Sequence, residues 1–347
     1  MRIAMISTPF IRLPPRGYGG TELFCYELAE ELTARGHQVT VFTTGDSVVT
    51  GRKRALYDKP AWPPTCADDV NHLAWAIAEV RRGAFDVIHL NSALGLPLGA
   101  FVNVPIVYTL HHHRDEGLSR IYAAHPEAYY VAISERQLKL ETPLPHASVI
   151  HHGLSPSRYL PSFEDAGYLL HLGRYAPEKG THVAIDIAQR VGLPIRLAGR
   201  THSVDQGYFD KYIAPRLELP NVHELGEADH AAKVALLRGA RALVCPIDWE
   251  EPFGLVAIEA MLCGTPVLGF ARGSFPELVD QNVTGFLVSS GNVEGLAHAV
   301  QMLDTFDRRR CARRARERFS TATMANAYEV AYKRAIALRR FAHVRVA

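Results

Sequence analysis

Short apolar runs alternate with amphipathic segments along almost the whole chain. Apolar runs of roughly four to eight residues between turn residues are typical of buried strands, and apolar positions three and four apart favour helices. We expect strands at Arg2–Ser7, Gln38–Thr43, Asp86–Leu90, Pro105–Thr109, Tyr129–Ile133, Tyr168–Leu172, Pro194–Ala198, Val222–Leu225, Ala242–Cys245, Pro266–Gly269 and Gly285–Val288. Helices are expected between them, for example at Gly20–Arg35, Asp68–Arg82, Lys179–Val191, Ala228–Gly239 and Phe253–Cys263. This alternation predicts an α/β protein with parallel sheets that helices cover on both faces.

The strand–helix order restarts after residues 154–167, a segment rich in Ser and Pro without a clear period. Such composition is typical of a linker. A chain of 347 residues is also long enough for two domains. We therefore predict an N-terminal domain at 1–155 and a C-terminal domain at 156–320, each Rossmann-like. A last helical pattern follows from Thr321 to about Arg340.

Composition excludes several classes of protein. The 38 basic and 36 acidic residues leave a net charge of +2, which gives no general attraction to nucleic acid or to an anionic membrane. Five cysteines without a CxxC pair indicate neither a disulfide framework nor a thiolate metal site, and a reducing cytoplasm is the expected location. We see no signal peptide and no apolar stretch of about 20 residues, so membrane association is expected to be peripheral at most.

The segment from Glu250 to Met261 carries the strongest chemical signal. Glu251 lies in a turn-like Glu-Pro-Phe-Gly, and Glu259 follows after seven intervening residues, about two turns into the predicted helix. The helix N-terminus at Gly254, Leu255 and Val256 offers unpaired N–H groups, which form a natural anion site. Two carboxylates beside an anion site suit a nucleotide sugar, with sugar hydroxyls at Glu251 and ribose hydroxyls at Glu259.

A second candidate phosphate site follows the strand at Tyr168–Leu172. The loop there carries Arg174 and Lys179 and then opens a helix. Arg offers a bidentate fork to phosphate oxygens and Lys a point charge, so together they would stabilise a departing diphosphate. A pair of solvated surface cations is the alternative, which the position at the carboxyl end of a strand disfavours.

Glycines also follow the first strand, in Arg16-Gly17-Tyr18-Gly19-Gly20-Thr21-Glu22. Gly19 and Gly20 allow the backbone to approach a ligand closely just before a helix N-terminus. The pattern is not GxGxxG, because Glu22 stands where the third glycine would be, so a dinucleotide site is not expected. An ordinary βα turn remains the alternative.

Three histidines, His111, His112 and His113, follow the strand at Pro105–Thr109. Their place at a carboxyl edge favours ligand binding. Consecutive side chains point in different directions and no acidic or Cys partner stands at a zinc spacing, so we expect no metal site.

Two weaker signals remain. An arginine run lies at Arg308, Arg309, Arg310, Arg313, Arg314, Arg316 and Arg318. It favours a solvated helix face over a surface for anionic lipid or a phosphorylated acceptor. Gly199, Arg200 and Leu225 follow strands and are candidates for the donor cleft or the nucleobase.

These motifs together resemble the retaining glycosyltransferases of family 4. The Gly-Gly loop, Thr109-Leu110-His111, Gly173-Arg174 with Lys179-Gly180, and Glu251-x7-Glu259 occur in the order of that family. The resemblance implies the GT-B fold, with an N-terminal acceptor domain, a C-terminal donor domain facing it across a cleft, and a final helix at about 321–347 that returns to the first domain. It also implies that Gly19 and Gly20 face the donor phosphate and that His111 contacts the transferred sugar. Which of His111, His112 and His113 makes that contact is not predicted, and His112 and His113 could instead shape the acceptor site or cap the loop.

The implied reaction is retaining transfer of a hexosyl group from a nucleotide diphosphate sugar to a hydroxyl acceptor. A UDP-sugar is favoured over a GDP-sugar, and neither metal nor cofactor is required, because Arg174, Lys179 and the helix end carry the charge. His111, Glu251, Arg174 and Lys179 are the expected catalytic residues. A nucleotide-sugar 2-epimerase of the same fold and a noncatalytic nucleotide-sugar-binding protein are the alternatives. The sugar, the acceptor and the oligomeric state are not predicted.

Overall fold

The computed structural model describes the backbone of residues 1–344 and the side chains of residues 1–339. The chain divides into two compact units, with the break after Gly153. Unit 1 contains residues 1–153 and the helix that begins at Thr321, and unit 2 contains Leu154–Ser320. The sequence-based boundary lies two residues later, after 155. Of the final helix predicted at about 321–347, residues 345–347 lie outside the described residues.

Unit 1 is built on a seven-stranded parallel sheet in the order β3-β2-β1-β4-β5-β6-β7. Its strands are β1 (Arg2–Ile6), β2 (Gln38–Thr43), β3 (Arg52–Ala55), β4 (Val87–Leu90), β5 (Ile106–Thr109), β6 (Tyr129–Ala132) and β7 (Ala147–Val149). Its helices are α1 (Gly20–Ala34), α2 (Cys66–Arg82), α3 (Gly95–Leu98), α4 (Glu116–Ala124), α5 (Glu135–Leu140) and α14 (Thr321–Val344).

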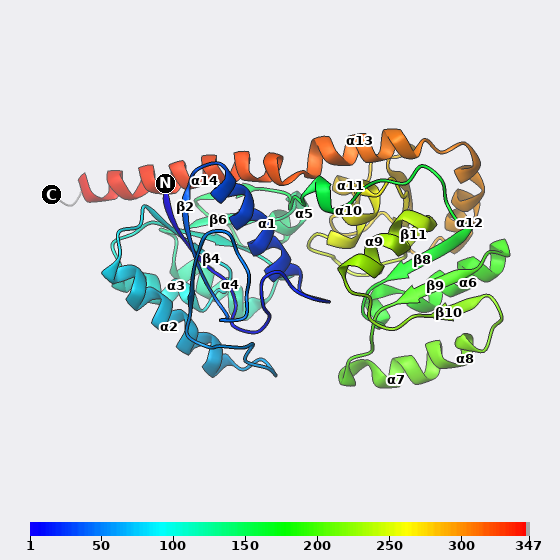
Figure 1. Cartoon of the computed structure of the whole chain (residues 1–347), viewed down its shortest axis with the longest axis horizontal. Coiled ribbons are helices and arrows are strands. Elements are labelled where there is room, and N and C mark those ends of the chain that lie inside the picture. Colours follow the sequence, from blue (N-terminus) through cyan, green and yellow to red (C-terminus); the bar gives the residue numbers. More distant parts are fainter. Residues whose placement is uncertain (345–347) are drawn as a thin grey trace. The chain divides into compact units, whose positions relative to one another are not determined.

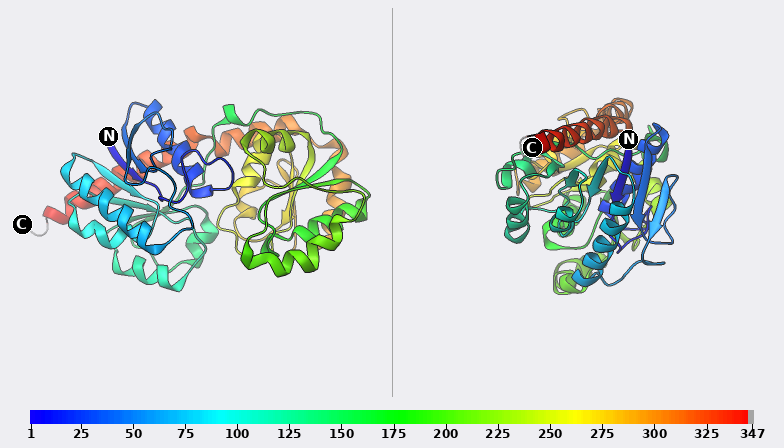
Figure 2. Two further views of the ribbon diagram at one scale, coloured as in Figure 1. Left: turned by 60° about the horizontal axis from the view of Figure 1, so that its bottom comes forward. Right: turned by 90° about the vertical axis from the view of Figure 1, so that its left-hand side faces the viewer.

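Both faces of this sheet are apolar, as the continuous apolar strands predict. Along β1, Ile3 and Met5 belong to a core with α1 and α14, whereas Ala4 and Ile6 belong to a core with α2. Successive strand residues point to opposite faces, so a strand covered on both sides needs apolar residues throughout. Figure 1 shows α14 beside α1, and Figure 2 shows α2 on the other side of the sheet.

Unit 2 repeats this plan with a six-stranded parallel sheet in the order β10-β9-β8-β11-β12-β13. Its strands are β8 (Tyr168–Leu172), β9 (Ile195–Ala198), β10 (Val222–Glu224), β11 (Ala240–Cys245), β12 (Val267–Phe270) and β13 (Gly285–Val288). Its helices are α6 (Thr181–Val191), α7 (Gln206–Tyr208), α8 (Ala214–Leu217), α9 (His230–Gly239), α10 (Leu255–Leu262), α11 (Phe275–Leu278), α12 (Val293–Gln301) and α13 (Arg308–Phe319).

The expected α/β class with two parallel, Rossmann-like sheets is confirmed. Two details of the prediction were wrong or incomplete. The edge strands β3 and β7 were not predicted, and Glu259 lies four residues after the first residue of α10, which is about one turn and not two. The helix is shorter at its N-terminus because Phe253 and Gly254 belong to the preceding loop.

Candidate functional site

The carboxyl edge of the unit 2 sheet collects the predicted donor residues. Because all strands of the sheet are parallel, the loops after β8 and β11 leave from the same edge. The first loop carries Arg174 and Lys179, and the second carries Glu251. The structure thus brings together, within one unit, residues that are more than 70 positions apart in the sequence.

Lys179 and Glu251 form an ion pair. The Nζ atom of Lys179 lies 2.5 Å from Oε2 of Glu251, and Nε1 of Trp249 donates to the same oxygen at 2.7 Å. The lysine Nζ also lies 5.1 Å from the centre of the Trp249 ring, a cation–π distance. Both side chains are mostly buried. Oε1 of Glu251 accepts no hydrogen bond from the described part of the chain, so it remains available to a ligand.

Arg174 is also paired with carboxylates. It bonds Glu178, and its Nη1 atom lies 3.0 Å from Oδ2 of Asp205. The sequence indicates Arg174 and Lys179 as phosphate ligands but not that each is paired with carboxylates of the same unit. Any anion that binds Arg174 or Lys179 would compete with Glu178, Asp205 and Glu251 for these cations.

The N-terminus of α10 begins at Leu255, after Gly254 as the N-cap residue. Gly254 has a left-handed backbone with φ 97°, and an added Cβ would lie 2.9 Å from the Phe275 ring. Both facts require glycine at this position. Leu255 and Val256 are the first two helical residues, whose N–H groups have no carbonyl one turn earlier to bond. The helix end therefore has the geometry of an anion site, as the sequence predicts.

Glu259, the predicted ribose ligand, is buried with two partners. The Tyr159 hydroxyl donates to its Oε1 atom at 2.8 Å, and Nζ of Lys233 bonds the same oxygen. Only 3% of the residue is exposed. Sequence reasoning missed Tyr159 and Lys233, since they come from segments 100 and 26 residues away and carry no local spacing signal.

The loops after β9 and β10 lie against the loop that carries Arg174. The nitrogen of Gly199 donates to the Gly226 carbonyl, and an added Cβ on Gly199 would lie 1.8 Å from the Gly173 carbonyl oxygen, so only glycine fits. Arg200 is half-exposed and 3.5 Å from Glu227. Leu225 is 49% exposed and lines a hollow of about 510 Å³ with residues of α9.

The corresponding edge of unit 1 carries His111. Its Nε2 atom lies 2.9 Å from Oδ1 of Asn91, and its ring packs on Phe24 and His152. Burial, with some repulsion from His152, lowers the pKa of His111 well below its usual value. By contrast, the side chains of His112 and His113 are exposed. Asn91, Phe24 and His152 thus hold His111 in a defined position.

The glycine loop lies at the same edge. Gly19 is the N-cap residue of α1 and Gly20 its first residue. Glu22 in the first turn is buried and accepts a 2.5 Å hydrogen bond from Thr8. Burial raises the pKa of Glu22 despite that bond. The loop therefore places a buried carboxyl group directly beside the predicted glycines.

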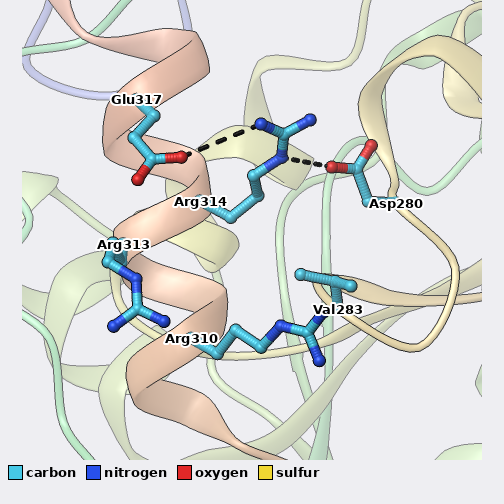
Figure 3. A pocket seen from close by; sticks show the side chains of 6 residues that line it. All are labelled: Asp280, Val283, Arg310, Arg313, Arg314 and Glu317. Carbon is cyan, nitrogen blue, oxygen red and sulfur yellow. Dashed lines mark hydrogen bonds and ion pairs between the residues drawn. The ribbon is translucent and has the colours of Figure 1, made fainter.

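The arginine run on α13 divides into structural and exposed side chains. Arg308 is buried and donates to the carbonyl oxygens of Ser162, Arg238 and Ala240. Figure 3 shows Arg310, Arg313 and Arg314 beside Asp280 and Val283 around a hollow of about 360 Å³. Arg314 pairs with Asp280 and Glu317. Because Asp280 and Val283 precede β13, this hollow lies at the amino edge of the sheet, opposite the donor residues.

Two classes of site are not seen in the part of the chain that the structure describes. No group of three or more His, Cys, Asp or Glu side chains has an arrangement that could hold a metal ion. Among residues 1–344, no helix combines the length and apolar character needed to cross a bilayer.

Comparison with known proteins identifies two adjacent family models. The model described as glycosyl transferases group 1 matches residues 157–318, and glycosyltransferase family 4 matches residues 18–158. The glycogen synthase of Mycobacterium tuberculosis is 28% identical over 92% of this chain and 91% of its own. The phosphatidyl-myo-inositol mannosyltransferase of Mycobacterium leprae is 28% identical over 87% of each chain. Anabaena HepE, solved with UDP and glucose, has a TM-score of 0.74 at 20% identity, covering 95% of this chain and 98% of its own.

Proposed function

Since the chain belongs to the family 4 type of group 1 glycosyltransferases and has the GT-B fold, we propose that it is a retaining enzyme that uses a nucleotide diphosphate sugar. The donor is a UDP-sugar in preference to a GDP-sugar, and the acceptor is a hydroxyl group. The observation that carries this proposal is the pairing of Lys179 with Glu251 beside the N-terminus of α10. One small region then offers a cation, a carboxylate and free N–H groups.

In this proposal unit 2 binds the donor. The phosphates bond Arg174, Lys179 and the N–H groups at Leu255 and Val256, and the backbone at Gly19 and Gly20 of unit 1 assists them. These groups stabilise the negative charge that grows on the leaving diphosphate. The enzyme therefore needs neither a metal ion nor a cofactor, since fixed cations supply the charge that Mg²⁺ provides elsewhere. Loss of activity in chelator, restored by one divalent ion, would contradict this point.

The two glutamates bind the two sugar rings of the donor, Glu251 the transferred sugar and Glu259 the ribose. Oε2 of Glu251 is held by Lys179 and Trp249, so Oε1 accepts from hydroxyls of the transferred sugar. Tyr159 and Lys233 both bond Oε1 of Glu259, which leaves Oε2 for the ribose hydroxyls. Gly199, Arg200 and Leu225 line the donor site near the base. Unit 1 binds the acceptor, and His111 contacts the sugar.

Retention follows if the acceptor hydroxyl attacks from the same face that the diphosphate leaves, with a phosphate oxygen taking its proton. The choice of UDP is supported by the bound UDP of Anabaena HepE, which resembles this chain in fold. The anomeric configuration of the product, read by NMR, tests retention directly.

A thermal-shift panel tests the proposed function. UDP, GDP, ADP and TDP are compared with and without attached sugars, and NAD serves as the control, because a ligand of the folded state raises its melting temperature. We expect one nucleotide diphosphate to stand out, with UDP strongest. A response to NAD alone would contradict the proposal. Conversion of a UDP-sugar to its 2-epimer without an acceptor would favour an epimerase, and binding without turnover of any donor would favour a binding protein.

A further inference from the structure

Asn91 connects His111 to the first strand of unit 1. It follows β4 directly, and only 2% of it is exposed. Its Nδ2 atom donates to the Ile6 carbonyl at 3.0 Å, and its Oδ1 atom lies 2.9 Å from Nε2 of His111. The two contacts use both ends of the amide, so the side chain joins β1 to the loop after β5.

These contacts determine which nitrogen of His111 carries a proton. A backbone carbonyl only accepts, so the amide nitrogen of Asn91 has to face Ile6. The other end of the amide is then an oxygen, which carries no hydrogen, and Nε2 of His111 must be the donor. A neutral imidazole has one N–H group, so Nδ1 of His111 presents a lone pair.

Packing holds the ring in this state. The centre of the His111 ring lies 5.1 Å from that of Phe24 and 5.7 Å from that of His152, which is stacked on it. The lowered pKa of His111, due mainly to burial, keeps the ring neutral at pH 7. Nδ1 accepts no hydrogen bond from the described residues, so it remains open to a ligand.

We infer that Asn91 is a positioning residue, which fixes His111 as the Nε2–H tautomer so that Nδ1 accepts a hydrogen bond from a hydroxyl of the transferred sugar. The sugar contact rests on the proposed function, whereas the tautomer does not. The inference has a consequence for specificity. If that hydroxyl is the one on C6, a uronic acid donor carries a carboxylate in its place, which has no proton to donate and would face a lone pair, so uronic acid donors are then disfavoured.

The tautomer is measured first, on the full chain without ligand. Long-range proton–nitrogen NMR of protein labelled at histidine distinguishes a protonated ring nitrogen from a bare one, and the His111→Gln variant assigns the signal by its absence. We expect a protonated Nε2 and a bare Nδ1. A protonated Nδ1 in the wild-type protein would overturn the inference and leave the proposed function untouched.

Variants then separate positioning from folding. In Asn91→Leu the fixed proton position is lost, and we expect a mixture of tautomers with about a tenfold lower kcat for UDP release from UDP-glucose, the value of one good hydrogen bond. UDP affinity should be unchanged, because Asn91 bonds Ile6 and His111 and none of the groups assigned to the nucleotide. Ser92→Ala is the matched control, since its hydroxyl bonds Asp69 and not His111. An unaltered tautomer in Asn91→Leu would contradict the role of Asn91.

Ligand additions test the sugar contact separately. UDP-glucose and GDP-mannose are each compared with the free nucleotide, and we expect one sugar donor, but neither nucleotide alone, to shift the Nδ1 resonance of His111. Weaker binding of UDP-glucuronate than of UDP-glucose would identify the hydroxyl at His111 as the one on C6. If a donor binds by calorimetry without shifting Nδ1, the sugar contact is wrong and the donor function stands. If neither donor binds and neither UDP nor GDP binds alone, both the sugar contact and the donor function are wrong, although the tautomer assignment survives.

Discussion

The carboxyl edges of the two sheets differ in charge, although the two units share one architecture. In unit 2 that edge holds ion pairs, with Lys179 on Glu251 and Arg174 on Asp205. In unit 1 it holds hydrogen-bonding groups, with His111 on Asn91, a buried His89 between Thr109 and Tyr332, and the buried Glu22 bonded to Thr8, whose pKa burial raises. A diphosphate demands fixed positive charge, whereas sugar and acceptor hydroxyls need only donors and acceptors. The same fold thus presents two kinds of edge, which suit the donor and acceptor roles proposed for the two units, and the loops after the strands determine the difference.

The two units also differ in their buried histidines, and this difference should have the largest effect, on the stability of each unit at mildly acidic pH. Unit 1 buries His72, His89 and His152, and burial lowers the pKa of His72 to about 4 and of the other two to about 3. Unit 2 buries His171, with its pKa lowered to about 4. Their stabilising contribution is complete above the unfolded pKa of about 6.5 and is lost as pH falls toward the folded pKa, because only the unfolded chain then binds protons. At pH 5.5 each of these four histidines costs on the order of 1 kcal/mol, and His111 of unit 1 adds to the loss, so unit 1 loses more stability than unit 2.

Tryptophan fluorescence can separate the two units in urea unfolding. Trp62 and Trp75 lie in unit 1 and Trp249 in unit 2. The Trp249→Phe variant therefore reports unit 1 alone, and a variant with Phe at 62 and 75 reports unit 2. We expect the midpoint for unit 1 to fall clearly further between pH 7.5 and pH 5.5. Equal shifts in the two variants would show that the buried histidines do not distinguish the units.

Removing the cations of unit 2 should have the next largest effect. Lys179→Ala deletes a proposed phosphate ligand and also removes the cation that pairs with Glu251, so the Glu251 carboxylate would repel a diphosphate. We expect UDP affinity to fall by about a hundredfold, which is roughly 3 kcal/mol for a lost charge-assisted contact, and transfer to be abolished. Arg174→Ala should behave similarly. Calorimetric titration with UDP measures the loss.

Arg310→Ala is the matched control for these variants. It removes an arginine of α13 that lines the hollow at the opposite edge of the sheet. Its UDP affinity should equal that of the wild-type protein. Wild-type affinity in both Lys179→Ala and Arg174→Ala would refute the phosphate assignment, and equal weakening in Arg310→Ala would show that net charge matters and not position.

Most strands could be predicted from the sequence because burial on both faces leaves a continuous apolar signal. The bounds of Gln38–Thr43 and Tyr168–Leu172 agree with the structure at both ends. By contrast, Arg52–Ala55 is an edge strand of Arg-Lys-Arg-Ala, largely exposed, and its charges remove the apolar signal. Natural proteins place charge on such edges to prevent unwanted strand pairing. The charges that protect this edge strand are therefore also the reason why the sequence did not reveal it.

The candidate site was predictable where short motifs carry it and not where tertiary contacts do. Arg174, Lys179 and Glu251 stand out by residue type and by their position after strands. Asp205 and Asn91 do not, because a single Asp or Asn in a loop is common and its partner lies in a distant segment. The ion pair between Lys179 and Glu251 likewise depends on the adjacency of β8 and β11, which no local spacing encodes.

The two glutamates offer the finest test, because they lie eight positions apart and have different surroundings. In Glu251→Ala, Lys179 loses its carboxylate and is freed for phosphate, so we expect UDP affinity to be kept or slightly raised while kcat falls by about a hundredfold. In Glu259→Ala the ribose loses one acceptor, and we expect about tenfold weaker UDP binding. Calorimetry with UDP and initial rates of UDP release measure both effects.

Glu259→Gln keeps the shape of the side chain and controls for damage to the fold, since Glu259→Ala leaves Lys233 and the Tyr159 hydroxyl without their shared partner. A lower melting temperature in the alanine variant alone would reflect that loss, whereas weaker UDP binding in both variants points to the ribose. Should Glu251→Ala lose UDP binding while Glu259→Ala loses only turnover, the division of roles is reversed. Glu251 would then contribute to phosphate binding through Lys179, and Glu259 would contact the reacting sugar. The burial of Glu259 one turn inside α10 disfavours that second role.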